Sequence, residues 1–211
     1  MSLTIELDSK IYYKMNSDNF ISFLKPLKEL FLTTKKIRIK STISDITGSC
    51  LDMFFKGLRE LPECIELLCD NNNLTFLPNL PKCEGIDCSN NNLELLPDIP
   101  SCKNLLCFNN RLKKLPNLPK CIHLSCTNNN IKNINIIPQC EWLECNYNKL
   151  ESIAFLPKCV DLDCSNNNLS SLSHQQLNVC QKILCHNNLI LNNNKKFMIF
   201  EKHYYTANTI V

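Results

Sequence analysis

Residues 83–101 read CEGIDCSNNNLELLPDIPS, and residues 102–120 read CKNLLCFNNRLKKLPNLPK. The two stretches are equally long and place cysteine, asparagine, leucine and proline at the same positions. The same pattern recurs along most of the sequence, with a second cysteine five residues after the first and an asparagine three residues later. A fixed period of this size predicts a solenoid of stacked units, in which each unit contacts only its neighbours.

Seven such turns can be aligned. The step is 19 residues throughout, except for a final step of 21 residues. The first cysteines are Cys64, Cys83, Cys102, Cys121, Cys140, Cys159 and Cys180. The second cysteines are Cys69, Cys88, Cys107, Cys126, Cys145, Cys164 and Cys185. The asparagines are Asn72, Asn91, Asn110, Asn129, Asn148, Asn167 and Asn188.

Each position of the repeat has a physical reason. In Ile86-Asp87-Cys88, two apolar residues flank an exposed one, which is the alternation of a short strand. Stacked strands of this kind form a parallel sheet with one face on the core. A buried asparagine must have its amide hydrogen-bonded, so the seven asparagines predict a ladder bonded to loop backbone. The two prolines of LPxLP exclude a helix and favour an extended or polyproline-II return segment.

The pattern C-x-x-L-x-C-x-x-N-x-L resembles the leucine-rich repeat, with cysteine at two of its leucine positions. The short LPxLP form is similar to the repeats of bacterial effector proteins that are delivered into host cells. The cysteine- and asparagine-rich version also resembles repeat proteins of large DNA viruses of amoebae. One branch of the effectors adds a ubiquitin-ligase domain, which we do not expect here because the sequence ends about twenty residues after the last repeat.

We therefore predict a leucine-rich repeat solenoid with a curved parallel β-sheet on its concave face, extended return segments and a partly helical N-terminal cap. Alternation at Leu3, Ile5 and Leu7 and at Ile37 and Ile39 predicts strands. A helix should start before Phe20, break or kink at Pro26 and continue as a second short helix to Leu32. The predicted segments are an N-terminal cap (1–44), a degenerate leading repeat (45–63), seven repeats (64–190) and a C-terminal cap (191–211).

The degenerate repeat is inferred from Cys50, Phe55 and Leu58, which precede their counterparts by one period. In the C-terminal segment, apolar residues supply either a cap or a docking tail. These residues are Phe197, Met198, Ile199, Phe200, Tyr204 and Tyr205.

Composition narrows the functional classes. A net charge of +3 is too small to indicate nucleic-acid binding by itself. No secretory signal or apolar run of membrane-spanning length is visible, so we expect a cytoplasmic protein, or one in the host cytoplasm if it is viral. No cofactor is expected. Two glycosylation sequons, at Asn73 and Asn168, arise from the repeat itself.

Fifteen cysteines in a secreted protein would indicate disulfides, but fourteen of these occupy inward positions of the repeat. We expect reduced thiols that pack as small apolar groups. The C-x4-C spacing is not that of a zinc site, so no metal is expected.

The binding surface should be the concave face, built from the exposed residues that flank each inward strand position. Leu106, Phe108, Trp142 and Tyr147 are large apolar groups in three consecutive turns there. The same face carries six acidic residues against one lysine, which favours a partner with a basic surface. The predicted binding residues are Leu106, Phe108, His123, Trp142, Glu144, Tyr147, Asp161 and Asp163.

The resulting hypothesis is a non-catalytic protein-interaction module, and the resemblance implies a host protein as partner. One alternative is nucleic-acid binding by a basic return face that includes Lys82, Lys103, Lys113, Lys120 and Lys158. Others are ligase-type effector or adaptor activity and self-assembly through the ends. A catalytic thiol is not expected, because Cys185 and His186 are adjacent on a strand and point to opposite faces.

Overall fold

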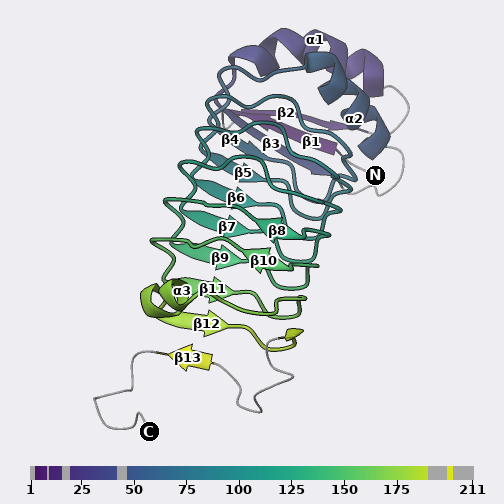
Figure 1. The fold of residues 1–211 in the computed structure, drawn as a ribbon. Coiled ribbons are helices and arrows are strands. Elements are labelled where there is room, and N and C mark those ends of the chain that lie inside the picture. Colours follow the sequence, from purple (N-terminus) through teal and green to yellow (C-terminus); the bar gives the residue numbers. More distant parts are fainter. Residues whose placement is uncertain (1–2, 9, 16–19, 42–46, 190–198, 202–211) are drawn as a thin grey trace, which may run out of the picture.

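The computed structural model describes residues 3–8, 10–15, 20–41, 47–189 and 199–201, and its main feature is one long sheet (Figure 1). The sheet contains eleven strands in the order β13-β12-β11-β9-β7-β6-β5-β4-β3-β1-β2. Neighbouring strands of the repeat region follow one another in sequence, and the chain returns on the opposite side of each turn (Figure 1). This is the predicted leucine-rich repeat solenoid.

Seven short parallel strands form the regular part of the sheet. Their middle residues are in register from Leu67 to Ile183 and are all buried, whereas most flanking residues are exposed or half-buried. The flanking side chains therefore form the concave face. The strands are β4 (Glu66–Leu68), β5 (Gly85–Asp87), β6 (Asn104–Leu106), β7 (His123–Ser125), β9 (Trp142–Glu144), β11 (Asp161–Asp163) and β12 (Lys182–Leu184).

The fourteen repeat cysteines are buried with free thiols, as predicted. They form two columns in the core. Thiols of the first column donate weak hydrogen bonds to the carbonyl oxygen two residues later, for example from Cys121 to His123 at 3.3 Å and from Cys140 to Trp142 at 3.4 Å. Cysteine therefore combines a small apolar volume with a donor for a strand carbonyl.

The seven asparagines of the repeat are buried in a continuous ladder. In a typical rung, Asn110 Nδ2 donates to the carbonyl oxygens of Cys88 and Cys107, at 3.0 and 3.2 Å, and Oδ1 accepts from Leu93 N at 3.0 Å. Each amide thus bonds its own turn and the preceding one. Because a buried backbone polar group must be paired, this ladder supports the tight loop that follows each strand.

The return segments have few regular elements, as the LPxLP motif predicts. In the fourth and fifth turns the first proline is replaced by Asn135 and Ala154. There, β8 (Asn133–Ile134) and β10 (Ser152–Ile153) pair in parallel, and Ala154 N donates to the Ile134 carbonyl at 2.8 Å. Proline has no N–H and could not make this bond.

The longer sixth turn lacks proline in its return segment and contains helix α3 (His174–Val179). The Ser173 side chain caps the helix by accepting a hydrogen bond from Gln176 N. The Gln176 side chain is buried, and its Oε1 accepts a hydrogen bond from Leu156 N at 2.8 Å. The two additional residues of this turn thus accommodate a small helix, which is hydrogen-bonded to the preceding turn through Gln176.

At the N-terminal end, β1 (Leu3–Leu7), β2 (Lys10–Met15) and β3 (Lys36–Ser41) extend the sheet. The predicted break at Pro26 is wrong, because helix α1 (Phe20–Thr33) continues through it. Phe31 is buried and its ring meets Phe54 of α2 edge-on at 5.1 Å. Packing of the following turns against α2 outweighs the local cost of proline.

The first half of the predicted leading repeat is also wrong. Residues 47–58 form helix α2 (Thr47–Leu58), and the strand that precedes β4 in the sheet is β3 instead. The second half follows the repeat, because Leu58 and Leu61 are buried and Glu60 pairs in parallel with Asn79. The helix occupies the place of a strand and loop because its apolar face, including Leu51 and Phe55, completes the core at this end.

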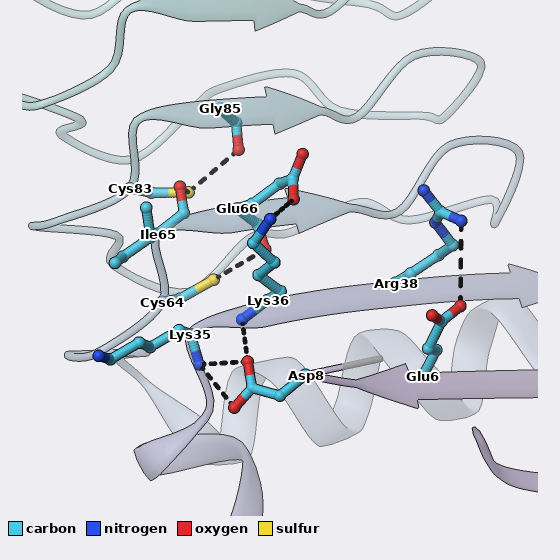
Figure 2. A network of polar contacts seen from close by, with 10 residues as sticks. All are labelled: Glu6, Asp8, Lys35, Lys36, Arg38, Cys64, Ile65, Glu66, Cys83 and Gly85. Atoms are coloured by element: carbon cyan, nitrogen blue, oxygen red, sulfur yellow. Dashed lines mark hydrogen bonds and ion pairs between the residues drawn. The ribbon is translucent and has the colours of Figure 1, made fainter. Parts of the chain in front are cut away.

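Polar contacts join this end to the first repeat (Figure 2). Asp8 Oδ1 accepts hydrogen bonds from the backbone N–H groups of Lys35 and Lys36, at 3.2 and 2.8 Å. The Lys36 ammonium lies 3.3 Å from a Glu66 carboxylate oxygen on β4. The turn between α1 and β3 is therefore tied to both the hairpin and the repeats.

At the other end, β13 (Ile199–Glu201) pairs antiparallel with β12. The strand lies beside the last repeat (Figure 1). Phe197, Met198, Tyr204 and Tyr205 lie outside the described residues. The role of the C-terminal segment remains a prediction, as do the boundaries of the four segments.

Candidate protein-binding surface

A shallow hollow of about 320 Å³ lies on the concave face, across strands β6 to β12. Two columns of side chains line it. One column contains His123, Trp142, Asp161 and Lys182, which begin consecutive strands. The other contains Leu106, Ser125, Glu144, Asp163 and Leu184, which end them. The hollow thus contains six of the eight predicted binding residues.

Trp142 is the dominant apolar group of this hollow and is 57% exposed. Its ring lies 5.2 Å, between centroids, from that of His123, at an angle of 56°. His123 Nδ1 lies 2.7 Å from Asn104 Oδ1, so the imidazole is held from its other side. The indole is therefore positioned by one neighbouring turn while much of its surface stays open to solvent.

The acidic groups lie next to this aromatic pair. Glu144 is two residues from Trp142 on β9, so both point to the same face, and Glu144 is in register with Asp163 on β11. Asp161 lies 3.7 Å from the Lys182 ammonium, whereas Glu144 and Asp163 form no salt bridge with any residue that the structure describes. The hollow therefore carries two adjacent carboxylates without a counter-ion.

Phe108 and Tyr147 do not line the hollow and lie beyond the ends of β6 and β9. Tyr147 has φ of 53° and is 58% exposed. The same position in the other six turns is asparagine with φ between 52° and 57°, namely Asn71, Asn90, Asn109, Asn128, Asn166 and Asn187. A bulky residue in this left-handed conformation is unfavourable, so Tyr147 is an exception that packing does not explain.

Lys182, Leu184 and Ser125 also line the hollow, although sequence reasoning did not single them out. Their positions in the repeat place them on the concave face. The repeat pattern did not predict the hollow itself. In the register, small Ser125 lies between the larger Leu106 and Glu144 and leaves room for a depression. The periodicity of the sequence predicts the columns of side chains on the concave face, and the sizes of the side chains along a column determine the shape of that face.

The return-side lysines are mostly neutralised. Lys82, Lys103 and Lys113 lie 2.7, 2.9 and 2.7 Å from the carboxylates of Glu63, Glu84 and Glu94, respectively. Lys158 donates to Gln139 at 2.6 Å. A second hollow of about 370 Å³ on this side contains Lys113, Lys114, Lys132 and Ile136. Pairing between adjacent turns thus weakens the basic return face as a phosphate-binding surface.

The buried thiols have the chemistry of core residues. Burial raises the pKa of Cys102, Cys121 and Cys126 to about 12, and it also raises the pKa of Cys185. A nucleophilic cysteine has a lowered pKa, so burial works against nucleophilic reactivity at these four thiols. The Cys50 side chain lies outside the described residues. Within the described ranges, no group of three or more His, Cys, Asp or Glu side chains could hold a metal ion.

The arrangement of the strands and returns agrees with a solved structure. The chain is similar to YopM, a leucine-rich effector protein from Yersinia pestis, with 25% sequence identity and a TM-score of 0.55. The similarity covers 69% of this chain and 48% of that protein, so the matched part spans about half the length of YopM. The fold is that of a leucine-rich repeat protein.

The resemblance inferred from the repeat pattern is thereby confirmed for the leucine-rich repeat and for its bacterial-effector form. No protein-family model matches the sequence, and no curated protein matches it either. In the part of this leucine-rich repeat protein that the structure describes, no helix is long and apolar enough to cross a membrane.

Proposed function

We propose that this leucine-rich repeat protein is a non-catalytic interaction module that binds a protein partner with a basic surface on its concave face. The observation that carries the proposal is the hollow in which exposed Trp142 lies beside the unpaired carboxylates of Glu144 and Asp163. By analogy with YopM, an effector protein, the partner would be a host protein met in the cytoplasm.

The exposed tryptophan supports a protein partner. Tryptophan is enriched among the residues that dominate binding energy, because it buries much apolar area with little loss of rotamer entropy. Trp142 is the only tryptophan of the sequence, and it stands on a rigid strand rather than on a loop. Leu106, at 38% exposure, and Leu184 add apolar surface at both ends of the acidic column.

The charge distribution supports a basic partner surface. Carboxylates on the concave face would attract cationic groups during encounter and orient them on docking. The same charges oppose nucleic acid, and the return-side lysines that would attract phosphate are mostly paired with glutamates. Phe108 and Tyr147 would lie at the margin of the interface, where a larger partner would reach them.

The proposal is tested by comparing Trp142→Ala with Leu95→Ala as baits for cytosolic proteins. Leu95 is a matched control because it is 56% exposed and lies away from the hollow. We expect a partner that is captured by the wild type and by Leu95→Ala, and lost with Trp142→Ala. The purified partner should then bind the wild type directly, with an affinity that falls as salt rises.

Both variants must first show the circular dichroism and melting temperature of the wild type. A partner that binds Trp142→Ala as tightly as the wild type would contradict the concave face as the binding surface. A nucleic acid that binds with a steep salt dependence and ignores the Trp142 change would favour the return face instead.

A further inference from the structure

Side chains at equivalent positions of adjacent turns are usually complementary in this protein. Acidic and basic partners face each other in Glu63–Lys82, Glu84–Lys103, Glu94–Lys113, Glu151–Lys132 and Asp161–Lys182, at 2.7 to 3.7 Å. In a stacked sheet, like charges directly opposite each other are destabilising, so this pairing is the expected arrangement. Glu144 and Asp163 depart from it.

These two carboxylates have no basic neighbour in their column. Glu144 lies between Ser125 and Asp163, and Asp163 lies between Glu144 and Leu184. One Asp163 oxygen, Oδ1, accepts hydrogen bonds from Ser165 N and Oγ at 3.0 and 2.7 Å, which leaves Oδ2 for another donor. Two adjacent acids therefore point to the solvent with accepting capacity in reserve.

An aromatic side chain, Trp142, lies beside the two carboxylates in the hollow. Trp142 and Glu144 point the same way from β9, so the indole and the two carboxylates border one space. Asp161 is already paired with Lys182, and His123 is already bonded to Asn104. The groups left to bind a ligand are one indole and two carboxylates.

We propose that this space is a subsite for an arginine side chain of the protein partner. A guanidinium is planar, stacks on an indole and offers forked N–H donors to carboxylates, whereas an ammonium presents a compact charge with no flat face. The subsite rests on the proposed function, and it names the group by which a basic partner would be anchored.

The direct test titrates the 211-residue chain with the peptide acetyl-Gly-Arg-Gly-amide, and with matched peptides that contain lysine or uncharged citrulline. Trp142 is the only tryptophan, so its fluorescence and its indole N–H resonance both report on this place. We expect saturable changes with millimolar affinity for the arginine peptide, weaker binding of the lysine peptide and none of the citrulline peptide.

Matched variants test the carboxylates. Glu144→Gln and Asp163→Asn should each weaken arginine binding about tenfold, the effect of losing one charge-assisted hydrogen bond. Asp87→Asn is the control, because Asp87 Oδ1 accepts from Ser89 N and Oγ at 3.1 and 2.6 Å as Asp163 does from Ser165, but outside the hollow. It should leave binding unchanged.

Equal responses to arginine and citrulline, or to arginine and lysine, would overturn the subsite. So would a calcium ion or an RNA oligonucleotide that gives the saturable change when the arginine peptide does not. A partner lost with Trp142→Ala but retained by Glu144→Gln and Asp163→Asn would overturn the subsite and leave the proposed function intact. Arginine binding without any captured partner would support the subsite and count against the proposed function.

Discussion

In one column of residues with left-handed backbone conformation, Tyr147 stands where the other six turns have asparagine. Asparagine tolerates the left-handed conformation because its short side chain bonds locally. The exposed asparagines also bond to one another, from Asn109 to Asn90 at 2.7 Å and from Asn128 to Asn109 at 2.8 Å. Tyr147 interrupts this exposed ladder, which resumes between Asn166 and Asn187 at 2.8 Å.

We expect Tyr147→Asn to stabilise the protein by roughly 0.5–1.5 kcal/mol, because it removes a bulky residue from the left-handed conformation at little loss of buried surface. Urea denaturation measures the change. The reverse substitution one turn later, Asn166→Tyr, should destabilise by a similar amount, since Asn166 has φ of 55°. A Tyr147→Asn variant less stable than the wild type would show that the tyrosine serves the fold.

At the scale of elements, the joint between helix α2 and the first repeat depends on one carboxylate. Asp52 accepts hydrogen bonds from the Lys56 ammonium at 2.7 Å, and from Thr75 N and Oγ1 at 2.9 and 2.6 Å. Burial raises the pKa of Asp52, but the bonds from Lys56 and Thr75 outweigh it and hold the pKa below its ordinary value. Helix α2, which lies in the predicted leading repeat, is thereby hydrogen-bonded to Thr75 of the first repeat.

We expect Asp52→Asn to lower the free energy of unfolding at pH 7 by about 1–2 kcal/mol. Because the folded-state pKa is lowered, this stabilisation is present above the ordinary carboxyl pKa of about 4 and is lost as the pH falls below it. The difference between wild type and variant should therefore shrink between pH 5 and pH 2. Glu63→Gln, in an exposed pair, should change stability by less than about 0.5 kcal/mol. A difference that is constant with pH would contradict this account.

The elements also show where sequence reasoning succeeded and where it could not. Strict periodicity at Leu67, Ile86 and their equivalents predicted the strands, because each position has the same neighbours in every turn. The N-terminal end had no such regularity: strand β2 pairs with its neighbour β1, outside the repeats, and helix α2 is held by contacts with Phe31 and Thr75, which are distant in sequence. Helix α3 was missed because nothing in the motif predicts what a turn without prolines adopts. The hollow needed the sizes of neighbouring side chains, which a repeat pattern does not supply.

At the scale of the whole molecule, we expect the cysteine core to make the folded state sensitive to alkali. Burial raises the pKa of Cys102 and Cys121 to about 12, against an ordinary value of about 8.5. Because the pKa of these thiols is higher in the folded state, the folded protein keeps its full stability below about pH 8.5. Above that pH the thiols of the unfolded chain release their protons first, which favours unfolding. The pKa is also raised at ten other buried thiols, which act in the same direction.

Under reducing conditions, we expect cooperative unfolding between about pH 9 and pH 10.5, since each thiol with a raised pKa lowers the free energy of unfolding by up to roughly 1.4 kcal/mol per pH unit there. Urea midpoints at pH 8, 9 and 9.5 measure the slope. The double variant Cys102→Ala/Cys121→Ala should be less stable at pH 7, through the cavities it creates, yet lose stability less steeply with pH. A stability that stays level up to pH 10 would contradict this prediction.

The pairing of charges between adjacent turns has a consequence for how the chain finds its order. Seven nearly identical turns could stack with one omitted, and the apolar core alone would barely distinguish that arrangement. Glu84 finds Lys103 one turn onward, but would find Ile122 if a turn were skipped. The unequal pattern of acids and bases on an otherwise uniform scaffold thus favours the correct stacking order of the turns over an arrangement that skips one.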